Sequence, residues 1–144
     1  VYNEEIMQSA WKNQYENYTT MKSATKLLKD FYQGKILSEK STEFLLAVMY
    51  RTSTGLNKIV EQLPKYAKVA HKTGSSGKND VGLTGAENDI AIITLPNGKH
   101  YAISVFVSDS KESETVNCKM ISDISKVVYD GLSNPKKGFF FNWK

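Results

Sequence analysis

The spacing of apolar residues changes near residue 65, and this change limits the folds that the chain can adopt. From residue 20 to residue 64, apolar residues recur every three or four positions, which is the spacing of one helical face. After it come three runs rich in β-branched residues: AKVAHKTG (67–74), DIAIITL (89–95) and HYAISVFV (100–107). A final stretch with helical spacing follows. This order predicts one α+β domain, in which helices pack on an antiparallel sheet of about three strands.

Three helices are predicted between residues 20 and 64. Thr20 and Ser38 are suitable N-caps for the first two, and Gly34 and Gly55 follow their ends. A short third helix ends at Pro64. Residues 1–19 have no sustained period, which predicts an irregular loop. The apolar positions on the three helices are Ala24, Leu27, Leu28 and Phe31; Leu45, Val48 and Met49; and Leu56, Ile59, Val60 and Leu63.

The strand runs predict a sheet with one exposed edge. Asn97-Gly98 between the last two runs favours a type I′ hairpin. Both runs are apolar on both faces, which predicts helices on both sides of the sheet. One of these is the last helix, residues 112–130, whose apolar stripe is Val116, Met120, Ile124 and Val127. The third strand would leave a long row of backbone groups unpaired, and natural sheets avoid such edges. We therefore expect part of the fold to be missing, and a chain that begins with Val1 rather than Met fits a fragment or a mature product.

Composition excludes several classes of function. The net charge of +4 invites a nucleic-acid hypothesis, but the lysines are scattered and Arg51 is the only arginine. Cys118 is the only cysteine, so no internal disulfide forms, and we expect it to be buried. His71 and His100 are too few and too far apart to suggest a metal site, and no cofactor is predicted. No apolar run is long enough to span a membrane.

The segment HKTGSSG, residues 71–77, carries the chemical signal of the chain. A Lys-Thr-Gly triplet closes a predicted strand, and the chain then continues into an Asn-Gly hairpin and a long helix. Over residues 1–132 the chain resembles the class A serine β-lactamases, which have Lys-Thr-Gly as a signature motif. TSTGLNKIVEQLP (52–64) resembles the family's Thr-Gly turn, and YNEE (2–5) resembles the end of its omega-loop motif.

The resemblance implies roles for six residues. Lys72 would supply positive charge beside the nucleophile and near the carboxylate of a β-lactam substrate. Thr73 and Ser75 would offer hydroxyl groups to that carboxylate, and Gly74 would let the substrate approach the strand. The backbone N–H of Ser75 would be one oxyanion donor. Lys58 stands where some members carry an arginine that binds the carboxylate; the alternative is a solvated helix position. Asn3 would help to hold the hydrolytic water, or else hydrogen-bond its own loop.

Other family motifs have no match in this sequence. Ser-Asp-Asn is absent, and there is no Ser-x-x-Lys on a helix that follows an apolar run. Ser23 and Lys26 have the right spacing, but they lie on a helix that resembles one downstream of the omega loop. The omega-loop glutamate would stand two residues before Val1. The resemblance therefore implies the C-terminal half of a β-lactamase, inactive alone, with the N-terminal half as its partner.

The expected organisation follows from this resemblance. Residues 1–132 would be the C-terminal part of the β-lactamase fold. They comprise the end of the omega loop with the segment that follows it (1–19), the helices (20–64), and the strands with the last helix (65–132). Residues 133–144 form a tail without an assigned role. The parent protein would be periplasmic or secreted, although this chain contains no signal peptide. Two alternatives stay open: a fragment of a penicillin-binding D,D-peptidase, and a non-catalytic binding module that docks through its open strand edge or its aromatic tail.

Overall fold

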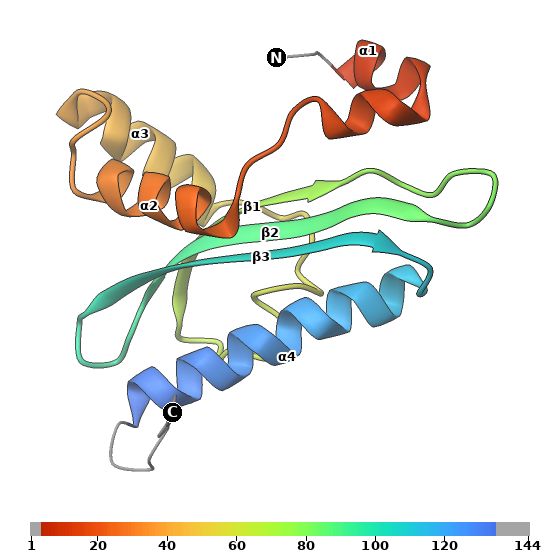
Figure 1. The fold of residues 1–144 in the computed structure, drawn as a ribbon. Coiled ribbons are helices and arrows are strands. Elements are labelled where there is room, and N and C mark those ends of the chain that lie inside the picture. Colours follow the sequence, from red (N-terminus) through yellow and green to blue (C-terminus); the bar gives the residue numbers. More distant parts are fainter. Residues whose placement is uncertain (1–3, 135–144) are drawn as a thin grey trace, which may run out of the picture.

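The computed structural model describes residues 4–134, which form a sheet with helices on both faces (Figure 1). A short helix α1 (Glu4–Ser9) and a 3-10 helix η1 (Trp11–Tyr15) precede α2 (Met21–Tyr32) and α3 (Glu39–Tyr50). The strands are β1 (Lys68–Ser75), β2 (Thr84–Thr94) and β3 (His100–Ser110), and α4 (Glu114–Ser133) follows them. α2 and α3 cover one face, and α4 covers the other. The predicted α+β architecture is confirmed.

The sheet is antiparallel throughout, with the order β1-β2-β3. β2 begins at Thr84, earlier than the predicted start at residue 89, because its first residues pair with the ends of both neighbours: Glu87 lies opposite Ser75 of β1 and Val107 of β3. Within the described residues β3 pairs with β2 alone. The expected open edge is therefore present.

Two apolar clusters hold the layers together. The cluster on the α4 face includes Ile93, Ile103 and Ile121, and the cluster on the α2 and α3 face includes Phe31 and Ile92. Neighbouring residues of β2 thus face opposite clusters, as the period of two in a strand requires. Cys118 is buried on α4, as expected, and burial raises the pKa of its thiol. The described part of the chain has no helix that is long and apolar enough to cross a membrane.

The segment predicted as a third helix is a series of turns. Its N–H groups bond carbonyls three residues back, as in Lys58 to Gly55 and Glu61 to Lys58. Ile59 explains the difference, because the Ile59 N–H donates to Asp89 at 3.2 Å and the Ile59 carbonyl accepts from Ser125 at 2.9 Å. With both groups engaged in tertiary contacts, a regular helical ladder cannot form through this residue.

The hairpin turn between β2 and β3 also differs from its prediction. Gly98 has a φ of +79°, but Asn97 is not among the residues with positive φ. A type I′ turn needs positive φ at both central residues. The Gly98 N–H donates to the Leu95 carbonyl at 2.9 Å, which makes Pro96 and Asn97 the central residues. Proline fixes φ near −65°, so the turn is of type I and Gly98 adopts the left-handed conformation after it.

The predicted apolar stripe of α4 lies on the outer side of the helix. Val116, Met120, Ile124 and Val127 are each exposed by 38–48%. The buried face instead carries Asn117, Cys118, Ile121, Ser122, Ser125 and Tyr129. Asn117 and Ser125 can be buried because each has a hydrogen-bond partner, respectively Ser110 and the Ile59 carbonyl. A stripe of apolar side chains therefore remains without cover in the described part of the chain.

The N-terminal segment contains α1 and η1 where an irregular loop was predicted. Its described part lies beside the end of the sheet at which β3 ends (Figure 1). The Tyr15 hydroxyl donates to Asp109 at 2.6 Å, and this hydrogen bond raises the pKa of Tyr15. The ring of Trp11 lies so close to Gly85 that a Cβ there would approach it to 3.1 Å. Asn3 and most of the predicted tail, residues 135–144, lie outside the described residues.

Candidate functional site

Lys72, Thr73, Gly74 and Ser75 lie together at the end of β1, a strand at the edge of the sheet. Lys72 is opposite Ile90, a residue packed with the α2 and α3 cluster, so its side chain lies on that face. Thr73 and Ser75 lie on the opposite face, because side chains alternate along a strand. The Lys72 ammonium is exposed and donates to the Thr73 carbonyl at 2.6 Å.

The backbone N–H of Ser75 is directed to the open edge of β1. The next residue, Ser76, donates its N–H to the Ala86 carbonyl at 2.9 Å, toward β2. Successive N–H groups of an extended strand point to opposite sides, so that of Ser75 points away from β2. An unpaired N–H in this position is a donor available to an oxygen that approaches the edge, such as the oxyanion of an attacked carbonyl.

Thr54 completes a pair of hydroxyl groups at this edge, and the sequence analysis did not single it out. Its Oγ1 lies 3.1 Å from Oγ1 of Thr73. Gly55 has a φ of +61°, and a Cβ there would lie 2.5 Å from Cγ2 of Thr73. Only glycine permits this approach. The TSTG sequence was a signal for the contact, because a glycine after a helix predicts a tight left-handed turn.

Replacing Gly55 with alanine is expected to destabilise the chain by roughly 2–5 kcal/mol. The left-handed conformation costs about 1–2 kcal/mol, and the overlap with Thr73 adds about 1–3 kcal/mol. Gly34→Ala is the matched control, because Gly34 has a φ of +69° and no atom within 4 Å of its Cβ position. Urea unfolding should give a clearly larger loss for Gly55→Ala. Equal losses would show that the contact with Thr73 has no energetic weight.

Lys58 is buried behind the Lys-Thr-Gly strand, with 5% of its surface exposed. It lies in the turn segment and is shielded from solvent, so the alternative prediction of a solvated helix position for Lys58 was wrong. Its ammonium forms an ion pair with Glu87, and it also donates to the carbonyls of Gly74 and Asn88, each at 3.3 Å. Glu87 is 3% exposed and accepts the Ser75 hydroxyl at 2.9 Å. Sequence reasoning missed Glu87; the one signal was an acidic residue just before an apolar strand run.

A second buried pair, His71 and Asp89, supports the same strand. His71 Nδ1 lies 3.3 Å from both carboxylate oxygens of Asp89, and both residues are almost fully buried. Asp89 also accepts the Ile59 N–H. The pair thus ties β1, β2 and the turn segment together. The sequence analysis discussed His71 only to exclude a metal site and did not predict its pairing with Asp89. Within residues 4–134, no group of three or more His, Cys, Asp or Glu side chains could hold a metal.

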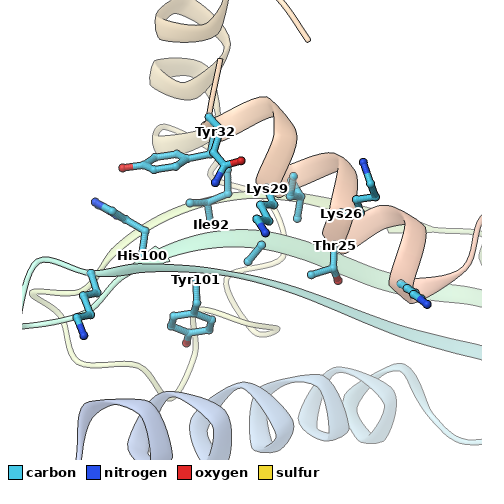
Figure 2. Close-up of a pocket in the computed structure, with 12 residues that line it drawn as sticks. Thr25, Lys26, Lys29, Tyr32, Ile92, His100 and Tyr101 are labelled. Atoms are coloured by element: carbon cyan, nitrogen blue, oxygen red, sulfur yellow. The ribbon is translucent and has the colours of Figure 1, made fainter. Parts of the chain in front are cut away.

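A separate groove of about 730 Å³ lies between α2 and β3, away from the Lys-Thr-Gly edge (Figure 2). Its apolar lining includes Leu28, Ile92 and Ala102. Figure 2 shows Lys26, Lys29 and His100 around it, and Tyr32 packs on His100 with ring centroids 4.7 Å apart. Part of its lining comes from β3, the strand that has an unpaired edge among the described residues.

Comparisons with known proteins agree with this geometry. Residues 1–132 match the model of the Beta-lactamase enzyme family. The chain is 48% identical to Beta-lactamase VEB-1 of Pseudomonas aeruginosa, over 92% of this chain and 44% of VEB-1. It is 42% identical to the extended-spectrum beta-lactamase PER-1 of Pseudomonas aeruginosa, over 90% of this chain and 42% of PER-1. The crystal structure of TLA-1 extended-spectrum beta-lactamase matches with a TM-score of 0.90 at 52% identity, over 92% of this chain and 48% of TLA-1. The chain thus spans about half the length of each.

Proposed function

Because this chain belongs to the beta-lactamase enzyme family, we propose that it supplies the substrate-binding edge of a class A serine β-lactamase. The parent reaction is hydrolysis of the β-lactam amide through an acyl-enzyme, which confers antibiotic resistance. The observation that carries the proposal is the geometry of β1, where the exposed Lys72 and the outward N–H of Ser75 lie at one open sheet edge. These groups suit a substrate carboxylate and a developing oxyanion.

The proposal divides the site between two halves of one fold. Lys72, Thr73, Gly74 and Ser75 would contact the substrate, and Lys58 would support the carboxylate site. Asn3 would position the hydrolytic water. The family motifs found in this sequence are not those that carry the nucleophilic serine, its lysine or the general-base glutamate. The N-terminal half would supply them, and we propose that the isolated chain does not turn over β-lactams. No metal or cofactor takes part in the proposed reaction.

The uncovered surfaces suggest where the other half would dock. The unpaired side of β3 presents free backbone groups, and the groove beside α2 and the outer stripe of α4 are apolar surfaces exposed in the described residues. Surfaces of this extent mark interfaces rather than solvated faces. We propose that the N-terminal half adds strands to β3 and covers these surfaces. As the family resemblance implies, the parent protein would act in the periplasm or outside the cell.

The isolated chain is expected to show no hydrolysis of a chromogenic cephalosporin. A chimera in which this chain replaces the matched stretch of VEB-1 is expected to hydrolyse it, because all parts of the site are then present. The assay follows the colour change, with the remaining part of VEB-1 alone as control. Turnover by the isolated chain, or a folded but inactive chimera, would contradict the proposal. Acylation of the chimera followed by very slow deacylation would favour the D,D-peptidase.

A further inference from the structure

Glu87 uses both oxygens of its carboxylate on groups that the proposed function places at the site of the substrate carboxylate. One oxygen, Oε1, pairs with the Lys58 ammonium, and the other, Oε2, accepts the Ser75 hydroxyl at 2.9 Å. We propose that Glu87 is a specificity-determining residue that competes with the substrate carboxylate for Lys58 and Ser75. This inference rests on the proposed function and deepens it, because it says which groups of the site remain for a carboxylate.

Lys58 has no free proton in this arrangement. An ammonium has three donors, and here they serve Glu87, the Gly74 carbonyl and the Asn88 carbonyl. The carboxylate that holds Lys58 is itself only 3% exposed. Burial of both charges strengthens their attraction, because water screens them poorly. A substrate carboxylate would therefore have to displace a buried carboxylate that is already in place.

Ser75 is committed in the same way. A serine hydroxyl has one proton, and that of Ser75 points to Glu87. Toward a substrate carboxylate, which only accepts hydrogen bonds, the hydroxyl then offers nothing. The backbone N–H of Ser75 is unaffected, because it points to the open edge. Glu87 thus opposes carboxylate binding without blocking the proposed oxyanion donor.

Lys72 and Thr73 are the groups that remain. Lys72 is exposed, and no carboxylate pairs with it in the described structure. The Thr73 hydroxyl bonds to the neutral hydroxyl of Thr54 and not to a carboxylate. The free charge at the strand edge is therefore that of Lys72, because Lys58 and Glu87 cancel each other. We expect carboxylate recognition by the wild-type site to depend on Lys72 and Thr73, and to gain strength once Glu87 is neutralised.

Glu87→Gln tests the competition directly. The probe is benzylpenicillin, added to the 15N-labelled chain at neutral pH, and the readout is the dissociation constant from the backbone amide shifts of residues 73–75. The variant is expected to bind about tenfold more tightly than the wild type, because a charge-assisted hydrogen bond to Lys58 becomes available. The methyl ester of benzylpenicillin, which lacks the charge, should bind both proteins equally.

Two further variants complete the experiment. In the double variant Lys58→Met/Glu87→Gln, no unpaired charge is left buried, and the gain in affinity for benzylpenicillin should disappear. Glu87→Asp shortens the side chain by one methylene and should give a smaller gain; it carries the test if Glu87→Gln does not fold. Equal penicillin affinity of folded wild type and Glu87 variant would overturn the inference and leave the proposed function intact. Failure of every variant to bind either ligand would overturn both.

Discussion

Asp89→Ala is expected to destabilise the chain by about 2–6 kcal/mol, because each buried polar group left without a hydrogen-bond partner costs about 1–3 kcal/mol. The substitution leaves two buried groups without their partner, His71 Nδ1 and the Ile59 N–H. Among the described residues the Nε2 atom of His71 has no hydrogen-bond partner, so Asp89 is the ring's only one. A loss of this size is a large part of the 5–15 kcal/mol typical of a whole domain. Urea unfolding followed by circular dichroism measures it.

Asp123→Ala is the matched control for Asp89→Ala. Asp123 lies on the outer side of α4, where its carboxylate is half exposed and bonded to Lys119 and Gln62. These bonds hold the pKa of Asp123 below its usual value. An exposed pair of this kind contributes about 0–1 kcal/mol, so the control should lose little. If Asp89→Ala cost no more than Asp123→Ala, the buried pair would not be what holds the turn segment to the sheet.

Lys72→Ala is expected to lower kcat/KM of the VEB-1 chimera by about 10²–10³-fold, the scale for losing one electrostatic contact in a transition state. The reason is that Lys72 is the free cation at the proposed carboxylate and nucleophile position. Initial rates with a chromogenic cephalosporin measure the change. Lys72→Arg keeps the positive charge but places it on a planar guanidinium group, so we expect its kcat/KM to lie between those of Lys72→Ala and the unmodified chimera.

Lys68→Ala is the control for this measurement, because Lys68 is an exposed lysine at the other end of the same strand. The kcat/KM of the Lys68→Ala chimera should stay close to that of the unmodified chimera. A Lys72→Ala chimera that retains most of its activity would remove Lys72 from the proposed site. Comparable losses at both positions would instead indicate a general effect of positive charge on the encounter with an anionic substrate.

Part of the candidate site could be predicted because its residues are contiguous. Lys72, Thr73, Gly74 and Ser75 form one motif, and a strand that ends in this motif brings them together whatever else the chain does. Thr54 and Glu87 come from other segments and reach the motif only through folding. Nothing local marks Glu87 as the partner of Lys58. Without the structure, Lys58 had a role by resemblance but no stated neighbour.

Features that depend on local chemistry were predictable from the amino-acid sequence. The change of period set the order of helices and strands, and Thr20 and Ser38 cap α2 and α3 by accepting the N–H groups of Ser23 and Ser41. Such signals act within a few residues, so they can be recognised without knowledge of the tertiary structure. The open edge of the third strand was also predictable, because it follows from the number of strand runs.

Which apolar stripes are buried, and where backbone groups find partners, depends on contacts between distant segments. On α4 two stripes have helical spacing, and the one with Ser125 packs inward, where the Ser125 hydroxyl donates to the distant Ile59 carbonyl. Residues 56–63 have the spacing of a helix, yet Asp89 and Ser125 take both backbone groups of Ile59. In each case the deciding contact joins residues far apart in sequence. Its energy exceeds a local preference of a few tenths of a kcal/mol per residue, and no short stretch of sequence can reveal it.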